Sequence, residues 1–282
     1  MSENPNTEQR ENRFFKPLTL LLFVSVLVCW FVLMTFPVQS FDYYYHLATG
    51  RWIAEHKAIP TTDVFSTTAG GRPWVTHEWA VQVGMYLKYR MGGVNYLLIM
   101  KSLWLAMAAG FLFVLGVRRL KAPIFWVVIL LTAVAPTVAF RAFMRPHVIS
   151  YGFLAMLLAV LYGNYFTEKR SRLVFPGVLF LVWANCHSGF VFGLFVLGVW
   201  QLFEFVNWYS TESKDDPRKP LDFAWPVLVG AVAALANPNF YHVYLYPFKF
   251  FQNSVLFEAV SELRPLNYPE FAGAWFIPVV YT

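Results

Sequence analysis

The chain has 282 residues, of which 58% are hydrophobic, 20% aromatic and only 13% charged. Soluble domains carry about 25% charged residues, so this composition excludes an ordinary soluble domain and predicts an integral membrane protein. The formal net charge of +6 would suggest nucleic acid as the partner of a soluble protein. Here the basic residues lie in short loops between apolar runs, so orientation in a bilayer explains them and no nucleic-acid partner is expected.

Apolar segments recur along the whole chain. Residues 1–13 are polar and mixed in charge, and we expect a disordered cytoplasmic tail there. Residues 18–38 form an apolar run long enough to cross a bilayer core of about 30 Å, and too long for a signal peptide with an apolar core of about 7–15 residues. Six more runs follow, at about 94–117, 123–140, 148–166, 173–185, 190–207 and 222–236, and residues 271–282 resemble the opening of another span. The sequence therefore predicts one all-α, polytopic membrane domain over 1–282, with about seven spans plus the start of another.

The longest polar interval, residues 39–92, separates the first two apolar runs. Bulky residues at helical spacing, with charges between them, predict a short amphipathic helix over 41–57, and Pro60 interrupts the backbone after it. A second amphipathic segment follows over 77–90 and ends at Gly92-Gly93. We expect this interval to form a large first extracytoplasmic loop that carries short amphipathic helices.

Basic residues indicate the side of the membrane that each loop occupies. With the N-terminus in the cytoplasm, alternation of the spans places three basic loops inside, namely RRLK, EKRSR and KDDPRK. This arrangement satisfies the positive-inside rule and predicts a multi-pass protein of the inner (plasma) membrane. The outer side then receives the long loop and the turns, which carry all six histidines. A scaffold has no reason to gather its histidines on one side, so we predict an extracytoplasmic active face.

Asp42 and His46 are the first candidates for chemistry. Asp42 lies where the first span leaves the membrane, and a carboxylate at that depth is costly unless it is paired or hydrated. The alternative is a helix N-cap, worth about 1 kcal/mol. His46 follows one helical turn later and can share a face with Asp42. That spacing suits a hydrogen-bonded pair or two ligands of a divalent metal, and it leaves metal dependence open.

Three further residues of the long loop are candidates for proton transfer. Asp63 follows Pro60-Thr61-Thr62 and either caps the next turn or takes part in chemistry. His77 and Glu78 begin the second amphipathic segment, where a glutamate also complements the helix dipole. All three therefore have a structural alternative to a catalytic role.

The outer turns carry the candidates for substrate binding. Arg141, Arg145 and His147 lie together at a membrane edge, where arginine either binds phosphate oxygens in a bidentate manner or reaches toward lipid headgroups. Asn185 and His187 interrupt an apolar run, and polar groups in such places usually face a cavity rather than lipid. The full set of substrate-binding candidates is Arg51, Arg141, Arg145, His147, Asn185, His187, Asn237 and His242.

Four stretches together resemble a known family. FDYYYHLATGRWIAEHKAIPTTDVFSTTAGGRPWVTHEWAVQV is similar to the first outer loop of bacterial membrane glycosyltransferases with the GT-C fold, in the group of the protein O-mannosyltransferase and RgtA/B/C/D-like enzymes. RPHVIS, WANCHSGF and LANPNFYHVYLYP resemble later outer turns of that group. The resemblance covers about residues 17–265. Such enzymes usually have more spans, so we expect this chain to be part of a longer protein.

The resemblance implies that the protein transfers a sugar from a polyprenyl-phosphate donor in the membrane to an acceptor on the extracytoplasmic side. By that likeness Asp42 is the acidic residue that acts as base or metal ligand, oriented by His46 or His77, with Asp63 and Glu78 in reserve. The groups expected to stabilise the leaving lipid phosphate are Arg141, Arg145 and His147. The pattern names neither the sugar nor the acceptor.

Two other classes of protein fit the same polar face. A transporter or lipid flippase would use a polar outer cavity for passage, but the sequence has no inverted repeat and no charge in mid-span to support it. A non-catalytic assembly subunit would respond to replacement of Asp42 only through its stability. Glycosyl transfer is therefore the favoured hypothesis.

Overall fold

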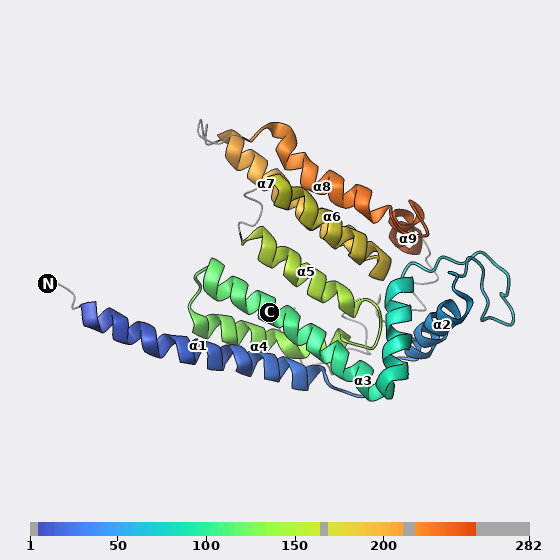
Figure 1. Cartoon of the computed structure of the whole chain (residues 1–282), viewed down its shortest axis with the longest axis horizontal. Coiled ribbons are helices and arrows are strands. Elements are labelled where there is room, and N and C mark those ends of the chain that lie inside the picture. The colour runs from blue at the N-terminus through green and yellow to red at the C-terminus, as the bar shows by residue number, and fades with distance from the viewer. Residues whose placement is uncertain (1–4, 164–168, 211–217, 252–282) are drawn as a thin grey trace, which may run out of the picture.

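The computed structural model describes residues 5–163, 169–210 and 218–251, and the elements in these ranges are helical (Figure 1). They are α1 (Pro5–Met34), α2 (Asp42–His56), α3 (Trp79–Val114), the π-helical η1 (Leu115–Arg119), α4 (Ile124–Arg141), α5 (Val148–Leu161), α6 (Lys169–Cys186), α7 (Phe190–Ser210), α8 (Pro220–Ala234) and α9 (His242–Phe251). No strand forms in these ranges, although Thr62 and Pro73 form an isolated β-bridge. The predicted opening of another span, residues 271–282, lies outside them.

Apolar helices occupy the positions of the runs seen in the sequence, but they differ in length. Within the described ranges, four helices are long and apolar enough to cross a membrane, namely Pro17–Met34, Trp79–Arg119, Ile124–Arg141 and Phe190–Ser210. The shorter apolar helices are Val148–Leu161, Leu173–Cys186 and Pro220–Ala234. The described chain is therefore an all-helical bundle compatible with a multi-pass membrane protein.

Large apolar side chains cover the outside of this bundle. Exposed fractions between 61% and 66% are found at Leu20, Leu21, Phe125, Phe195, Leu202 and Phe203. Contact with water would cost about 25 cal/mol per Å² of this apolar surface, whereas lipid tails are as apolar as leucine. The outer surface thus suits a bundle surrounded by lipid.

The N-terminal segment differs from the expectation of a disordered tail over residues 1–13. α1 begins at Pro5, so residues 5–13 extend the helix of the first apolar run. Glutamate, glutamine and arginine, which recur in TEQRENR, have high helix propensity. A helix that already exists also removes the cost of nucleating a new one. Residues 1–4 lie outside the described ranges.

Two large apolar clusters lie between the helices of the bundle. The first lies between α1, α3 and α4, where the indole Nε1 of Trp30 donates a 3.0 Å hydrogen bond to the Leu131 carbonyl. The second lies among α5, α6, α7 and α8, around the buried rings of Phe180 and Trp183. Trp104 of α3 packs against both clusters. Figure 1 shows α5 between α1, α3 and α4 on one side and α6, α7 and α8 on the other.

A bend in α3 places its first turns beside α2. The bend lies at Gly92 and Gly93, and Gly93 adopts φ 66° and ψ −159°, a conformation open to glycine. Before the bend, α3 packs so closely on α2 that any side chain at Gly50 would collide with the Gln82 carbonyl. In Figure 1, α2, the start of α3 and α9 lie at the same end of the bundle. The polar segments of the chain meet at this end.

Candidate functional site

A cavity of about 850 Å³ opens at the end of the bundle where α2 lies. Its walls come from α2, the segment before α3, the α4–α5 and α6–α7 turns, and α9. The predicted site residues that line it are Asp42, His46, His77, Glu78, Arg141, Arg145, His147 and His187. Segments far apart in the sequence therefore contribute carboxylates, imidazoles and guanidinium groups to one cavity.

Asp42 and Arg145 form an ion pair on the cavity wall. Arg145 Nε lies 2.9 Å from Asp42 Oδ2 and donates a 2.8 Å hydrogen bond to Ser40 Oγ. The N-cap of α2 is Phe41, without a side-chain cap, so Asp42 does not have the N-cap role weighed from the sequence. The Asp42 side chain is 54% exposed. An accessible carboxylate is thus bound to a guanidinium that faces the cavity.

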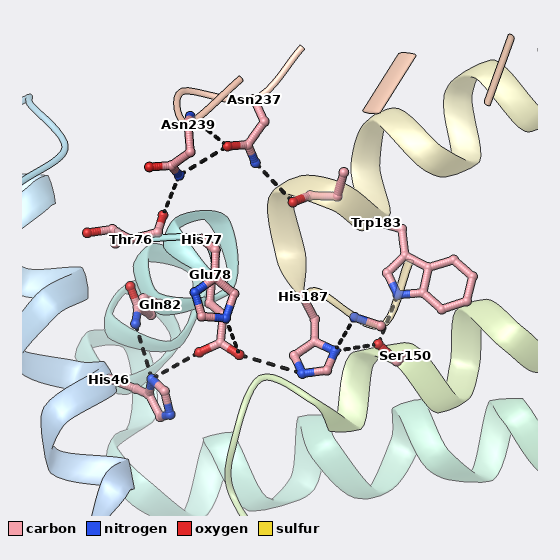
Figure 2. A network of polar contacts seen from close by, with 12 residues as sticks. His46, Thr76, His77, Glu78, Gln82, Ser150, Trp183, His187, Asn237 and Asn239 are labelled. Atoms are coloured by element: carbon pink, nitrogen blue, oxygen red, sulfur yellow. Dashed lines mark hydrogen bonds and ion pairs between the residues drawn. The ribbon is translucent and has the colours of Figure 1, made fainter. Parts of the chain in front are cut away.

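Glu78 precedes α3 and lies among three imidazoles (Figure 2). Its Oε1 is 3.6 Å from His77 Nε2 and 3.7 Å from His187 Nε2, and its Oε2 is 3.8 Å from His46 Nδ1. Only 13% of the side chain is exposed. Burial by itself raises the pKa of Glu78, but the interactions with His77, His187 and His46 outweigh it and lower the pKa below its ordinary value. The carboxylate is therefore ionised at neutral pH.

Hydrogen bonds hold His187 from the side away from Glu78 (Figure 2). Its Nδ1 lies 2.9 Å from the Gly189 backbone nitrogen and 2.8 Å from Ser150 Oγ, and Trp183 Nε1 donates to that same oxygen at 2.8 Å. A side chain at Gly189 would lie 2.5 Å from Ser150 Oγ, so this close approach requires glycine. Burial lowers the pKa of His187 to about 4. The imidazole is therefore neutral at neutral pH.

The two other imidazoles beside Glu78 are also fixed in position. His46 is buried on α2, and its Nδ1 lies 3.1 Å from Gln82 Nε2. Burial lowers the pKa of His46. The ring of His77 packs on Tyr246 of α9, with the ring centroids 3.9 Å apart. Contacts from α2, α3 and α9 thus determine the surroundings of the carboxylate.

The α4–α5 turn contributes Arg141 and His147 to the cavity. His147 Nε2 lies 2.8 Å from the Arg141 carbonyl oxygen. A carbonyl oxygen only accepts hydrogen bonds, so Nε2 of His147 carries its proton. Aromatic side chains complete the cavity wall, at Tyr45, Trp74, Tyr151 and Tyr246.

Asn185 and Asn237, which we expected to bind substrate, contact protein groups beside the cavity. Asn185 Oδ1 accepts a 2.8 Å hydrogen bond from Trp79 Nε1. Asn237 Nδ2 donates to the Ala184 carbonyl at 2.9 Å and to Asn185 Oδ1 at 3.2 Å. These amides join the ends of α6 and α8 to the start of α3. They therefore support the segment that carries Glu78.

Besides Asn185 and Asn237, three more predicted residues lie outside the cavity lining. Asp63 Oδ1 accepts two backbone N–H hydrogen bonds of 2.9 Å from the following turn, as expected for a turn cap. Arg51 Nε lies 2.8 Å from Glu55 Oε1 one helical turn later, and both side chains are largely exposed. His242 is exposed at the start of α9. The described geometry gives these residues structural or surface positions.

Metal ligation was left open by the sequence. Among the residues that the structure describes, no group of three or more histidine, cysteine, aspartate or glutamate side chains is placed to hold a metal ion. Asp42, one of the two suggested ligands, binds the guanidinium of Arg145. His46, the other, directs Nδ1 at Gln82 and Glu78. Both suggested ligands therefore have protein partners in the structure.

Several residues of this site escaped the sequence analysis, namely Gln82, Ser150, Trp183 and Tyr246. Ser150 and Trp183 lie in apolar helices, where serine and tryptophan usually serve packing. The available signal was their place within RPHVIS and WANCHSGF, the stretches that also carry His147 and His187.

Over the residues that the structure describes, the chain is a helical bundle with an apolar outer surface and a polar cavity that combines carboxylates with arginines. Comparison of the chain with protein-family models, with curated protein sequences and with solved structures gives no match. The function is therefore argued from the cavity itself.

Proposed function

We propose that the protein is a membrane glycosyltransferase that moves a sugar from a polyprenyl-phosphate donor to an acceptor on the extracytoplasmic side of the inner membrane. The observation that carries this proposal is the meeting of two kinds of group in one cavity. Asp42 and Glu78 supply carboxylates that can accept a proton. Arg141 and Arg145 supply guanidinium groups that match phosphate oxygens.

The membrane topology belongs to the same proposal. All seven apolar helices would span, with the N-terminus in the cytoplasm and the cavity on the opposite side. α5 has 14 residues, which at about 1.5 Å per residue gives a helix of about 21 Å. That is shorter than the bilayer core of about 30 Å, so the turns that flank α5 would enter the interface. With these turns in the interface, the cavity would lie close to the lipid headgroups, where a lipid-linked donor carries its phosphate.

A second cavity supports a lipid-linked donor over a soluble one. This mostly apolar cavity of about 320 Å³ is lined by residues that include Val81, Met85, Leu97 and Trp104, together with the basic residues Lys88 and Lys101. Arg145 belongs to its lining as well as to that of the polar cavity. A phosphate bound at Arg145 would therefore have apolar side chains on one side and the polar cavity on the other. A polyprenyl-phosphate sugar has its prenyl chain and its sugar on opposite sides of the phosphate in the same way.

Binding of undecaprenyl phosphate to the purified full-length protein tests this site without knowledge of the sugar or the acceptor. A charged hydrogen bond contributes about 1.5–3 kcal/mol, so Arg145→Ala should weaken binding by about tenfold or more. Arg145→Lys keeps the charge but loses the planar fork, so its affinity should lie between the two. Arg51→Ala is the matched control, because Arg51 is exposed and pairs with Glu55 outside the cavity.

Two outcomes would contradict the proposal. If the folded Arg145→Ala protein bound undecaprenyl phosphate as the wild type does, Arg145 would be only a headgroup anchor. If the wild type bound undecaprenyl phosphate and never released sugar from a donor, a flippase would be favoured over a transferase.

A further inference from the structure

We propose that Glu78, rather than Asp42, accepts the proton of the attacking hydroxyl, and that His187 is a positioning residue held by Ser150 and Trp183. This inference rests on the proposed sugar transfer and assigns the proton acceptor of that reaction. It follows from three features of the cavity.

The first feature is the position of each carboxylate relative to the phosphate site. When a group is displaced from an anomeric carbon by direct attack, the base serves the face opposite the leaving group. Asp42 binds Arg145, the group proposed to hold the leaving phosphate, so it lies on the side of the phosphate. Glu78 lies elsewhere in the same cavity, among imidazoles from α2, the segment before α3 and the α6–α7 turn. Glu78 is therefore the cavity carboxylate that is not paired with the proposed phosphate-binding group.

The second feature is the availability of the Glu78 oxygens. The Asp42 carboxylate is already paired with a guanidinium at 2.9 Å, so a ligand hydroxyl would have to share that contact. The Glu78 oxygens have their imidazole neighbours at 3.6–3.8 Å, beyond the usual length of a hydrogen bond. A buried carboxylate held at this distance keeps capacity to accept a hydrogen bond from a ligand hydroxyl.

The third feature is the fixed tautomer of His187. The Gly189 backbone N–H can only donate, so Nδ1 of His187 accepts and carries no proton. Trp183 Nε1 donates to Ser150 Oγ, which leaves the serine hydroxyl hydrogen free to point at the same Nδ1. The proton of the neutral ring is therefore on Nε2, the atom that faces Glu78 Oε1 at 3.7 Å. This N–H presents its partial positive charge to the carboxylate across a gap that is too long for a direct hydrogen bond.

Serine, histidine and glutamate in this order resemble the groups of a nucleophilic triad, but the geometry gives Ser150 another role. Ser150 is not among the residues that line the cavity. Its oxygen also accepts a hydrogen bond from Trp183 at 2.8 Å. Ser150 therefore orients His187 from behind instead of attacking a substrate.

The reaction step balances with the groups named. The acceptor hydroxyl transfers its proton to a Glu78 oxygen as its own oxygen bonds to the anomeric carbon. The bond between that carbon and the phosphate oxygen breaks, and its electron pair leaves with the polyprenyl phosphate. Arg145 stabilises this anion, and Glu78 later returns the proton to water. No oxidant or reductant is required.

The test measures release of sugar, with water as the acceptor, by full-length protein in lipid nanodiscs. The probes are tritium-labelled undecaprenyl-phosphate glucose, mannose, galactose and arabinose. Glu78→Gln keeps the shape and removes the proton acceptor, so kcat should fall by about 10²–10⁴, while undecaprenyl phosphate binds as in the wild type. Glu55→Gln is the matched control, because it makes the same change on an exposed carboxylate of α2 outside the cavity, and its kcat should equal that of the wild type.

Ser150→Ala tests the positioning role. Without the serine hydroxyl, His187 loses one of the contacts that fix its ring, so kcat should fall by about tenfold with KM unchanged. Ser102→Ala is the matched control, because Ser102 is also a buried, hydrogen-bonded serine but lies away from the cavity. Melting temperatures of all variants separate loss of catalysis from loss of folding. If Glu78→Gln fails to fold, Glu78→Asp replaces it as the test. Its side chain is one methylene shorter but keeps the carboxylate, so it should retain part of the activity.

The outcomes distinguish this inference from the proposed function. If the wild type releases sugar and the folded Glu78→Gln protein releases it equally fast, the assignment of Glu78 is wrong and sugar transfer stands. If the Ser150→Ala and Ser102→Ala proteins behave alike, His187 is not positioned through Ser150. If the wild type neither binds undecaprenyl phosphate nor releases sugar from any probe, the proposed function fails and the role of Glu78 fails with it.

Discussion

Arg145 Nε lies 2.9 Å from Asp42 Oδ2, and this ion pair joins the start of α2 to the α4–α5 turn. Arg145 belongs to the lining of both the polar and the apolar cavity. The Asp42 carboxylate is thus paired with the same guanidinium that would bind a donor phosphate. Asp42 and a donor phosphate would compete for the same group.

Asp42→Asn should therefore affect donor binding more than turnover. Partly exposed ion pairs contribute about 0.2–1 kcal/mol, so removal of the competing charge should tighten binding of undecaprenyl phosphate by at most about fivefold. The change in kcat for sugar release should stay below about tenfold, because Glu78 remains to accept the proton. Binding isotherms and initial rates on the same preparation check both numbers. A fall in kcat by about 10²–10⁴ would return the role of base to Asp42.

His187 should make the stability of the protein depend on pH. Burial lowers its pKa from 6.5 in the unfolded chain to about 4 in the folded protein. The unfolded state therefore binds more protons between these values, so stability is complete above pH 6.5 and is lost as the pH falls toward 4. The contribution is on the order of 3 kcal/mol.

Thermal unfolding in detergent at pH 7, 5.5 and 4 checks this expectation. His187→Gln cannot titrate, so its melting temperature should fall less over this range than that of the wild type. His242→Gln is the control, because His242 is exposed on α9. A wild-type curve parallel to that of His187→Gln would show that His187 is not buried as a neutral imidazole.

The helical bundle could be predicted from the sequence, because hydrophobicity along the chain is a local property. The apolar runs match apolar helices, and the pair Gly92-Gly93 marks the bend in α3. The lengths of the individual helices were less predictable from the sequence. Turns after residues 141 and 186 shorten the helices around them, and nothing in composition alone distinguishes an apolar helix of 14 residues from one of 18.

Only part of the site could be predicted. The sequence analysis placed all the histidines on one side of the membrane and from this selected His46, His77, His147 and His187. The cavity does bring these four side chains together. The resemblance ranks Asp42 above Glu78 as the base. The ion pair between Asp42 and Arg145 could not be predicted, because it depends on how α2 meets the α4–α5 turn. For Asn185 and Asn237, the sequence does not distinguish an amide that binds a substrate from one that binds a neighbouring helix.

The orientation of the bundle is open to a direct test in a protein without Cys29 and Cys186. A cysteine in place of Ser66, which is exposed in the loop after α2, should react with an impermeant thiol reagent added to whole spheroplasts. A cysteine in place of Leu120, which is exposed beside η1 near the basic residues of the α3–α4 connection, should react only after lysis. The reverse pattern would place the cavity in the cytoplasm and contradict an extracytoplasmic reaction.

The central claim is that the cavity catalyses sugar transfer from a polyprenyl phosphate. The measurement that tests it most directly is the appearance of undecaprenyl phosphate, followed by mass spectrometry, when purified protein is incubated with each undecaprenyl-phosphate sugar of the panel. The account predicts product from at least one donor with the wild type, and a loss of on the order of 10² or more when Glu78→Gln and Arg145→Ala are combined. Equal product from the wild type and the double variant, or none from the wild type with any donor, would contradict it.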